Sequence, residues 1–326
     1  MKRQKIIVVI LLSLFFSLVT PDTSYAKEEG KYIKWIDFKI TSNALKDASE
    51  IDISTKNTEL HLDWISILSY LGQKYGGDFS KYSKKDLNEL CEKAKNKPIE
   101  ELCANKKLYE YYKKAYGAVL GGMLGEYYTE NENGERSGKA EYGIKAFSPI
   151  ARGYSYNHYD DFGASRSYGY KRHHLGHDIM GSIGTPVIAV ESGYVEALGW
   201  NQYGGWRIGI RSFDGQRYYY YAHLRKDNPY NDLYEGKYVS AGEVIGFLGM
   251  TGYSSKENVN NINVPHLHYG LQIIFDKSQK DGANQIWIDM YEITKFLSSH
   301  TSLCQKSENT KIYTVKKKII DSDFPD

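Results

Sequence analysis

The residues best suited to chemistry in this chain of 326 residues are its histidines, six of which lie between residues 173 and 268. The first group contains His174-x-x-x-Asp178, and residues four apart share one face of a strand and nearly share one face of a helix. An imidazole and a carboxylate at this spacing can therefore converge on one ion. On an extended chain His173 and His177 point to the opposite side, whereas on a helix His177 competes with His174 as the ligand.

Two further histidine patterns follow along the chain. His266-Leu-His268 places two imidazoles at i and i+2, which project to the same side of a strand. One of the two suits a metal ion, and the other lies within hydrogen-bond reach of a water molecule on that ion. His223 ends a tyrosine-rich run, where strand alternation puts it on the same side as Tyr219 and Tyr221.

These residue types together suit hydrolysis at a zinc ion. Catalytic zinc commonly keeps three protein ligands and one open position, and it lowers the pKa of a bound water from about 15.7 toward ~7. Further histidines can move the proton of that water or stabilise an oxyanion. One His-x-His pair alone is typical of unrelated loops, but the three patterns in this order are far more specific. No His-Glu-x-x-His segment occurs, which excludes the peptidases that use the glutamate of that motif as base.

The second half of the chain is expected to supply the strands that position these side chains. From about residue 141, short runs rich in Val, Ile and Tyr alternate with glycines, which indicates strands and tight turns. Short, closely spaced strands favour an antiparallel sheet over a parallel one. The clearest strands cover residues 186–191, 206–211, 217–222, 243–248 and 267–274.

The first half has a different texture, and its apolar spacing predicts a mainly helical region. Ser83-Lys-Lys-Asp86 resembles a capping box at the start of one helix, and another helix is expected over residues 98–118. Residues 129–139 are polar and rich in turn formers, which is typical of a linker. The expected organisation is an export signal over residues 1–26 and a helical region over residues 27–140. A catalytic domain over residues 141–300 and a polar, solvated tail over residues 301–326 follow.

The first 26 residues have the pattern of an export signal, with a basic start and an apolar run over residues 6–19. Small residues at Ser24 and Ala26 predict cleavage before Lys27, and an uncleaved membrane anchor is the rival interpretation. The apolar run is shorter than the roughly 20 residues of a transmembrane helix, and no later stretch is long enough to span a membrane. Cleavage removes three basic residues and one acid, which takes the formal net charge from +2 to zero. Nothing in this balance indicates a nucleic-acid partner.

The three cysteines leave two interpretations open. Export permits a disulfide, and Cys91 and Cys103 lie near each other in one segment. They either form a bridge or are small buried thiols, and the odd count leaves one cysteine over. No pair has Cys-x-x-Cys spacing, which disfavours a thiolate zinc site.

The histidine segments resemble those of the M23 metallopeptidases, the lysostaphin and LytM-like class. Residues 184–195 are similar to a strand–turn–strand of that family, and residues 242–252 to its glycine-rich approach to the last strand. The resemblance covers roughly residues 145–275. Three segments match the motifs HxGxD, YAHL and PHLH, and they are His174-Leu-Gly-His-Asp178, Tyr221-Ala-His223-Leu224 and Pro265-His266-Leu-His268.

Carried over by position, the resemblance implies one zinc ion per chain, held by His174, Asp178 and His268. It implies that His223 and His266 are the catalytic pair that orients water and stabilises the transition state. The implied fold is α+β, with a mainly antiparallel β-sheet catalytic domain after the helical region. The implied protein is a secreted or cell-wall-associated endopeptidase that cuts stem peptides or cross-bridges of bacterial peptidoglycan.

The chain departs from the family pattern at two places. Residues 253–264 intervene before the PHLH segment, and we expect this insertion to form a wall of the groove and alter specificity. Gly270 stands where the family often has glutamate. The helical region matches no wall-binding module.

Two other functions are compatible with such a sequence. One is a scaffold or regulatory protein that binds zinc and the wall or a partner without turnover, although relatives of that kind typically lack some of the site residues. The other is a glycan-binding protein, which the thirty tyrosines suggest. A further hypothesis is that the helical region keeps the enzyme latent, which predicts that residues 141–300 alone are more active than residues 27–326.

Overall fold

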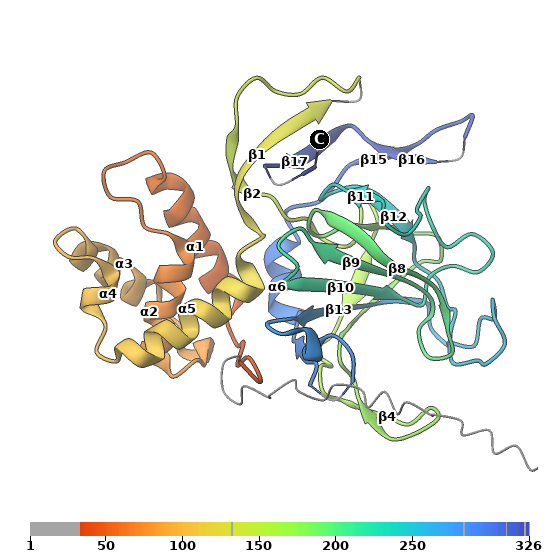
Figure 1. Cartoon of the computed structure of the whole chain (residues 1–326), viewed down its shortest axis with the longest axis horizontal. Coiled ribbons are helices and arrows are strands. Elements are labelled where there is room, and N and C mark those ends of the chain that lie inside the picture. The colour runs from red at the N-terminus through yellow and green to blue at the C-terminus, as the bar shows by residue number, and fades with distance from the viewer. Residues whose placement is uncertain (1–32, 132, 283, 311, 323, 326) are drawn as a thin grey trace, which may run out of the picture. The chain divides into compact units, whose positions relative to one another are not determined.

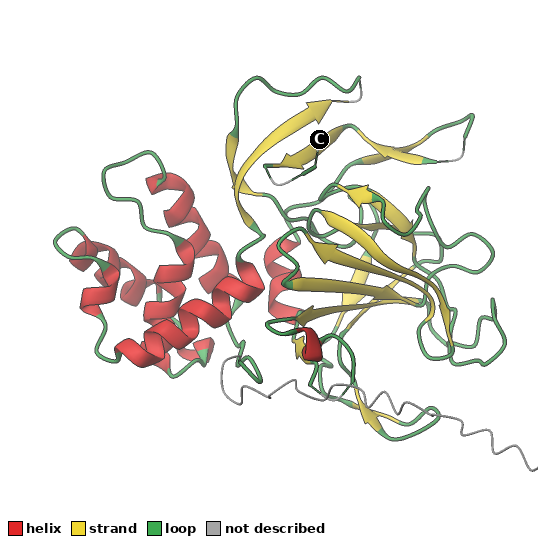
Figure 2. Ribbon diagram, viewed as in Figure 1, coloured by secondary structure: helices red, strands yellow, loops and turns green. Residues whose placement is uncertain are grey.

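The computed structural model describes residues 33–326 apart from residues 132, 283, 311, 323 and 326, so the predicted export signal lies outside the described residues. Within the described part, no helix is both long and apolar enough to cross a membrane. A mainly helical region precedes a largely antiparallel β-sheet region (Figure 2). The predicted α+β class is confirmed.

Polar side chains cap the helices at their amino ends. Asp63 accepts a hydrogen bond from the backbone of Ser66 at 2.9 Å, which satisfies a donor that the helix itself leaves free. Ser83 caps the next helix as predicted, but the carboxylate of Asp86 accepts from Tyr75 and Lys74 instead of completing a capping box. The helices of this region are α1 Ser42–Thr55, α2 Trp64–Tyr75, α3 Lys84–Ala94, α4 Ile99–Leu102 and α5 Lys106–Leu120, with a 3-10 turn at Phe79–Lys81 (Figure 1).

The β-sheet region is built on one antiparallel sheet of eight strands. The strand order is β11-β8-β9-β10-β13-β6-β3, and β14 also pairs with β13. Three of the predicted strands correspond to β9, β10 and β13 within about one residue at each end. The other two, over residues 186–191 and 243–248, are not in the main sheet. They contribute β7 Pro186–Ile188 and β12 Val244–Phe247, which pair with each other in a separate two-stranded sheet. The strands of the main sheet are β3 Tyr156–His158, β6 His177–Gly181, β8 Gly193–Asn201, β9 Gly205–Ser212, β10 Arg217–Ala222, β11 Tyr238–Val239, β13 His266–Ile273 and β14 Ile286–Ile288.

The register of β13 brings the histidine motifs to one face of this sheet. His268 pairs with Asp178 on β6 and with Ala222 at the end of β10. Because side chains alternate along a strand, His266 and His268 point to the same side, while Leu267 and Tyr269 are buried on the other. The three motifs therefore meet at the centre of the sheet.

The C-terminal residues differ from the expected solvated tail. β15 Cys304–Lys306 pairs with β16 Tyr313–Val315, and β17 Lys317–Asp321 pairs with β1 Leu124–Asn131, which in turn pairs with β2 Glu141–Ile144. Ile319 and Ile320 are buried, and Asp321 forms an ion pair with Lys145 at 2.6 Å. The predicted linker begins within β1 and ends just before β2, so a β-hairpin takes its place.

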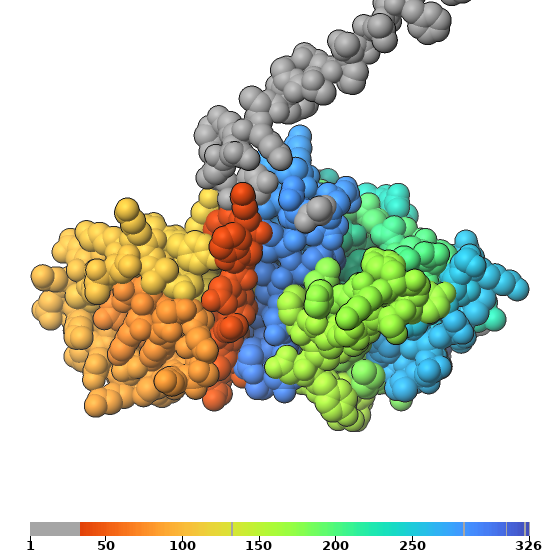
Figure 3. Space-filling model, turned by 90° about the horizontal axis from the view of Figure 1, so that it is seen from below, coloured from red at the N-terminus to blue at the C-terminus, as the bar shows by residue number. Residues whose placement is uncertain are grey.

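The helices and the sheet share one hydrophobic core, which includes residues from α1 to α6 and from the central strands. Helix α6 Tyr291–Leu297 contacts α1, and Glu292 accepts from the backbone of Ser42 at 2.6 Å (Figure 3). Arg217 of β10 is 3% exposed; it forms an ion pair with Glu191 at 2.8 Å and donates to the carbonyl of Ala118 in α5. The helical region is thus packed into the same core as the sheet.

Candidate active site

Three side chains converge on one point at the end of β13. His174 Nε2 lies 2.9 Å from His268 Nδ1 and 3.0 Å from Asp178 Oδ1, and the last two atoms are 3.1 Å apart. Asp178 and His268 face each other across the β6–β13 ladder, and His174 comes from the segment just before β6. All three predicted ligands therefore meet, and the cluster fits a metal site.

The donor set and its spacing suit zinc. Zinc bonds to imidazole nitrogen and carboxylate oxygen are about 2.0–2.2 Å long, so three ligand atoms of a tetrahedral site lie roughly 3.3 Å from one another. The observed triangle is only slightly tighter. Two imidazole nitrogens that face each other at 2.9 Å repel if both present lone pairs, which a shared cation or proton relieves. Two histidines and one carboxylate also leave a fourth position open for water or substrate.

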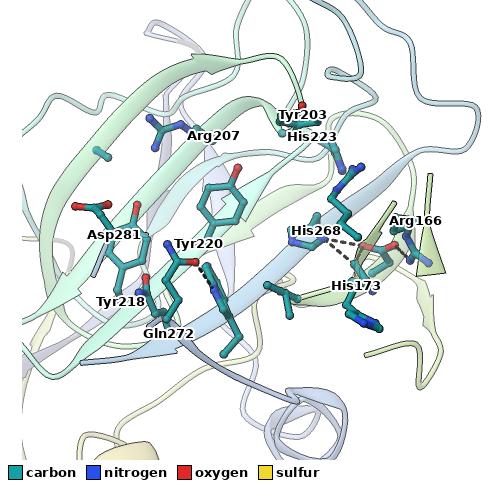
Figure 4. A pocket seen from close by; sticks show the side chains of 18 of the residues that line it. Arg166, His173, Tyr203, Arg207, Tyr218, Tyr220, His223, His268, Gln272 and Asp281 are labelled. Carbon is teal, nitrogen blue, oxygen red and sulfur yellow. Dashed lines mark hydrogen bonds and ion pairs between the residues drawn. The ribbon is translucent and has the colours of Figure 1, made fainter. Parts of the chain in front are cut away.

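Two residues that the sequence patterns did not single out hold the ligands in place. His174 Nδ1 lies 3.2 Å from the carboxylate of Asp161 and 3.1 Å from its backbone carbonyl oxygen. Because both are acceptors, the proton of His174 stays on Nδ1, and Nε2 is left as the ligand atom. Arg166 donates to Asp161 at 2.8 Å and to Asp178 Oδ2 at 2.9 Å. Asp178 consequently presents Oδ1 to the two histidines. Figure 4 shows Arg166 beside this cluster.

The structure decides which histidine of the first motif belongs to the cluster. His177 lies on β6 opposite Tyr269, on the side of the sheet that faces away from Asp178. Its Nε2 is 2.8 Å from His158 Nδ1, and Tyr291 packs against its ring. Burial and the neighbouring His158 lower the pKa of His177 to about 4, so it is a neutral core residue. His173 is exposed on β5 Arg172–His173, which pairs with β4 Ser165–Arg166.

The electrostatics of the metal-free cluster follow from its two carboxylates. Burial opposes the charged form of His174, but hydrogen bonds and charges from Asp161 and Asp178 outweigh it and raise the pKa of His174 to about 9. Burial likewise opposes the charge of Asp178, yet hydrogen bonds from His174 and His268 hold its pKa well below the usual range. Burial dominates at His268, whose pKa is lowered although Asp178 opposes the shift.

His223 and His266 lie against the cluster and against each other. Their ring centroids are 4.8 Å apart, and His266 Nε2 is 3.8 Å from Asp178 Oδ1. His223 Nδ1 donates to the carbonyl of Thr251 at 2.8 Å, and His266 Nδ1 to that of Val264 at 2.8 Å. Each ring is therefore oriented by backbone through Nδ1, which leaves Nε2 for the site.

His223 has an unusual backbone that turns its ring toward the cluster. Its φ angle is +59°, in the left-handed region that non-glycine residues seldom occupy. The carbonyl of Thr251 and the next residue, Gly252, with φ of +120°, pack against the imidazole. A Cβ at position 252 would lie 3.0 Å from His223 Nδ1, so glycine there allows the close approach. Burial, reinforced by His266 and His268, lowers the pKa of His223 well below its usual value.

A groove of about 450 Å³ opens over these residues. Tyr220 and Gln272 line it on one side of His268 in the view of Figure 4, and His173 and Arg166 line the other. Trp287 also lines the groove. Tyr253, the first residue of the insertion, lines it as well and stacks on Tyr168 with ring centroids 4.6 Å apart. The expectation that the insertion contributes to the groove is thus met by Tyr253.

The sequence of this region matches a known family. Residues 172–282 match the model of Peptidase family M23. The chain carries an M23 peptidase domain. The M23 domain includes the three ligand candidates and both further histidines, so the predicted resemblance is confirmed.

Curated relatives share the M23 domain but not most of the chain. The L-Ala–D-Glu endopeptidase of Bacillus subtilis (strain 168) is 40% identical over 135 residues, which is 41% of this chain and 40% of that protein. Lysostaphin of Staphylococcus simulans is 42% identical over 97 residues, 29% of this chain and 17% of that protein. The chain thus spans less than half the length of either relative.

One solved structure resembles nearly all of the described chain. It is a Ruminococcus gnavus protein provisionally assigned as the glycyl-glycine endopeptidase lytM, with 20% sequence identity and a TM-score of 0.52. The similarity covers 79% of this chain and 90% of that one. At this identity the likeness shows the fold, and its coverage extends well beyond the M23 domain.

Proposed function

We propose that this protein is a secreted zinc-dependent endopeptidase that hydrolyses peptide bonds of bacterial peptidoglycan. The observation that carries the proposal is the triangle of His174, Asp178 and His268, with His266 Nε2 at 3.8 Å from Asp178 Oδ1 and the ring of His223 at 4.8 Å from that of His266. The names of the relatives, an L-Ala–D-Glu endopeptidase and lysostaphin, support peptide bonds of the wall as the substrate. We assign one zinc ion per chain to the triangle.

The two remaining histidines divide the proton chemistry. Zinc, when bound, supplies a Lewis acid that polarises a carbonyl and acidifies water. His223 is held neutral by burial, with its Nδ1 proton donated to Thr251, so its Nε2 is placed to accept a proton from the attacking water. We assign stabilisation of the oxyanion to His266, whose Nε2 lies 3.8 Å from Asp178 Oδ1. Tyr253 packs on His223 and helps to exclude bulk water from it.

The test is release of products from purified peptidoglycan by the chain without residues 1–26, loaded with zinc. We expect new amino termini and no new reducing sugar ends, because the bond cut is a peptide bond. His266→Ala and a chelated sample are expected to lose the activity by at least about 100-fold. His300→Gln is the matched control, because it removes a histidine outside the groove and is expected to remain active.

Other outcomes would contradict the proposal in distinct ways. One zinc per chain with no release from several wall chemistries would favour the scaffold function. Release that survives both His266→Ala and the chelator would place the chemistry elsewhere in the molecule. Export is tested separately by sequencing the amino terminus of the protein recovered from the culture medium, and a terminus at Lys27 is expected.

A further inference from the structure

The charged side chains that line the groove differ in whether they already have partners. Arg166 is occupied by Asp161 and Asp178, and Lys280 forms an ion pair with Glu196. Arg172, the next basic lining residue, donates to the carbonyl of Tyr168 and lies over the rings of three tyrosines, Tyr170, Tyr203 and Tyr253.

Arg207 is the exception among these basic residues. In the described part of the chain no carboxylate lies within ion-pair distance of its guanidinium, and its Nε has no hydrogen-bond partner, while the positive charge acts on the nearby hydroxyls of Tyr218 and Tyr220. The side chain is half-buried, and that Nε is fully buried. Arg211, four residues further along the chain on the same face of β9, contrasts with it by binding Glu196 at 2.7 Å. A buried guanidinium nitrogen without an acceptor costs free energy, which a ligand oxygen would recover.

The strand register places Arg207 on the same side of the sheet as the metal cluster. Ile208 pairs with Tyr221, so Arg207 lies at the level of Ala222, which pairs with His268 on the next strand. Two strand spacings separate Arg207 from His268, or about 10 Å. Ala222 between them is buried, whereas Arg207 and His268 both line the groove. In Figure 4 Arg207 lies with Tyr220 on one side of His268, opposite Arg166.

The floor beside Arg207 is uncharged and aromatic, because the rings of Tyr218 and Trp287 lie over two glycines of the sheet. Gly209 and Gly270 flank Tyr220 on the neighbouring strands and place no side chain there. A Cβ at position 209 would lie 2.0 Å from the hydroxyl oxygen of Tyr218, so that tyrosine ring lies across the glycine. Of the two acidic residues that line the groove, Asp178 belongs to the metal cluster, and Asp281 lies beside Tyr218, further along β10.

These observations select the chemistry of the ligand. A guanidinium binds a carboxylate through two parallel hydrogen bonds, and such charge-assisted bonds are stronger where water is partly excluded. An extended peptide advances about 3.3 Å per residue, so 10 Å corresponds to roughly three residues from the bond held at the metal cluster. Glycine cross-bridges carry no carboxylate at that distance, whereas stem peptides with an acidic residue do.

We propose that Arg207 is a specificity-determining residue that binds a free carboxylate of the substrate peptide within about three residues of the cleaved bond. The substrate class is accordingly the anionic stem peptide rather than the glycine cross-bridge. This inference rests on the proposed endopeptidase function, and it concerns binding, which can be measured without turnover.

The test compares two peptides that differ by one charge. They are L-alanyl-γ-D-glutamyl-L-lysyl-D-alanine and its twin in which the free glutamyl α-carboxylate is an amide. Binding to the zinc-loaded chain of residues 27–326 is measured by calorimetry in the His266→Ala background, which prevents turnover. We expect the carboxylate peptide to bind about 10- to 100-fold more tightly than the amide, as for a hydrogen-bonded charge pair.

Substitutions at Arg207 then assign the preference to that side chain. Arg207→Gln is expected to weaken binding of the carboxylate peptide to the level of the amide and to leave the amide unchanged, while Arg207→Lys retains part of the preference. Arg136→Gln removes an exposed arginine outside the groove and should keep the full preference. Thermal unfolding of each variant establishes that it is folded. If Arg207→Gln is not folded, Arg207→Lys replaces it in the comparison of the two peptides.

The outcomes separate this inference from the proposed function. Equal binding of the two peptides, or a preference that survives in folded Arg207→Gln, would overturn the role of Arg207. If the chain with His266 intact still releases peptides from the wall, that result would contradict only the role of Arg207 and leave the endopeptidase function supported. Carboxylate-selective binding that depends on Arg207, without any cleavage of the wall, would support the binding role and contradict the endopeptidase.

Discussion

The two oxygens of Asp178 have different tasks. Oδ1 faces His174 and His268, while Oδ2 accepts from Arg166, which also binds Asp161. Asp161 in turn orients His174. A change at Asp161 therefore reaches the metal through the proton on His174 rather than through a lost ligand.

We expect zinc binding at pH 7 to release about one proton per ion, because a ligand must be deprotonated and His174 has a pKa of about 9 in the metal-free chain. The raised pKa means that the charged form of His174 stabilises the metal-free fold fully below about pH 6.5, and this contribution is lost as the pH rises through 9. In Asp161→Asn, one of the carboxylates that raise this pKa is gone, so fewer protons are released. Calorimetry in buffers of different ionisation enthalpy measures the number.

The same variant is expected to bind zinc about 10- to 100-fold more weakly above pH 9, where proton competition no longer matters, because the histidine ligand loses its orienting partner. Arg136→Gln is the control for a lost charge elsewhere. Unchanged proton release and unchanged affinity in folded Asp161→Asn would show that Asp161 does not act on the metal cluster.

At the scale of elements, β10 joins the site to the helices. Its last residue pairs with His268, and its first, Arg217, is buried in a network with Glu191, Tyr219 and the carbonyl of Ala118 in α5. The pKa of Tyr219 lies well above its usual value because burial and the Glu191 charge both oppose its ionisation, so it acts as a neutral donor. The strand is thus fixed at both ends by polar contacts.

Arg217→Met is expected to lower the free energy of unfolding by about 3–5 kcal/mol, because it leaves the buried carboxylate of Glu191 without its charged partner. The double variant Arg217→Met with Glu191→Gln should recover part of this loss, since no unpaired charge remains. Urea unfolding measures both. A loss below about 1 kcal/mol in the single variant would mean that the ion pair is not what joins strand to helix.

Strand alternation in the sequence indicated the pair His266 and His268, which are two apart on β13, and the resemblance to M23 peptidases implied the full set of five residues. It did not predict Asp161 or Arg166, because neither lies in a periodic pattern: Arg166 is on β4, and Asp161 is in the turn that precedes it. The roles of the tail and the linker were also not apparent. Two isoleucines beside a run of lysines are too few to indicate a strand, and only pairing with β1 buries them.

At the scale of the whole molecule, the helical region is part of the same core as the sheet, and none of its residues that the structure describes lines the groove. This arrangement gives no support to the latency hypothesis. We therefore expect residues 141–300 alone to unfold at lower temperature than residues 27–326 and to be no more active on peptidoglycan. Thermal unfolding and the product-release assay measure the two properties, and a stable fragment of higher activity would restore the latency hypothesis.

The pairing of β1 with β17 has a consequence for the order in which the chain is made. Tyr127 lies opposite Asp321, so the three-stranded sheet closes only after residue 321 has been synthesised. Contacts so distant in sequence form slowly, since a long loop must first be brought together. A nascent chain that ends before β17 can pair β1 only with β2, and the third strand joins once residues 317–321 have emerged from the ribosome.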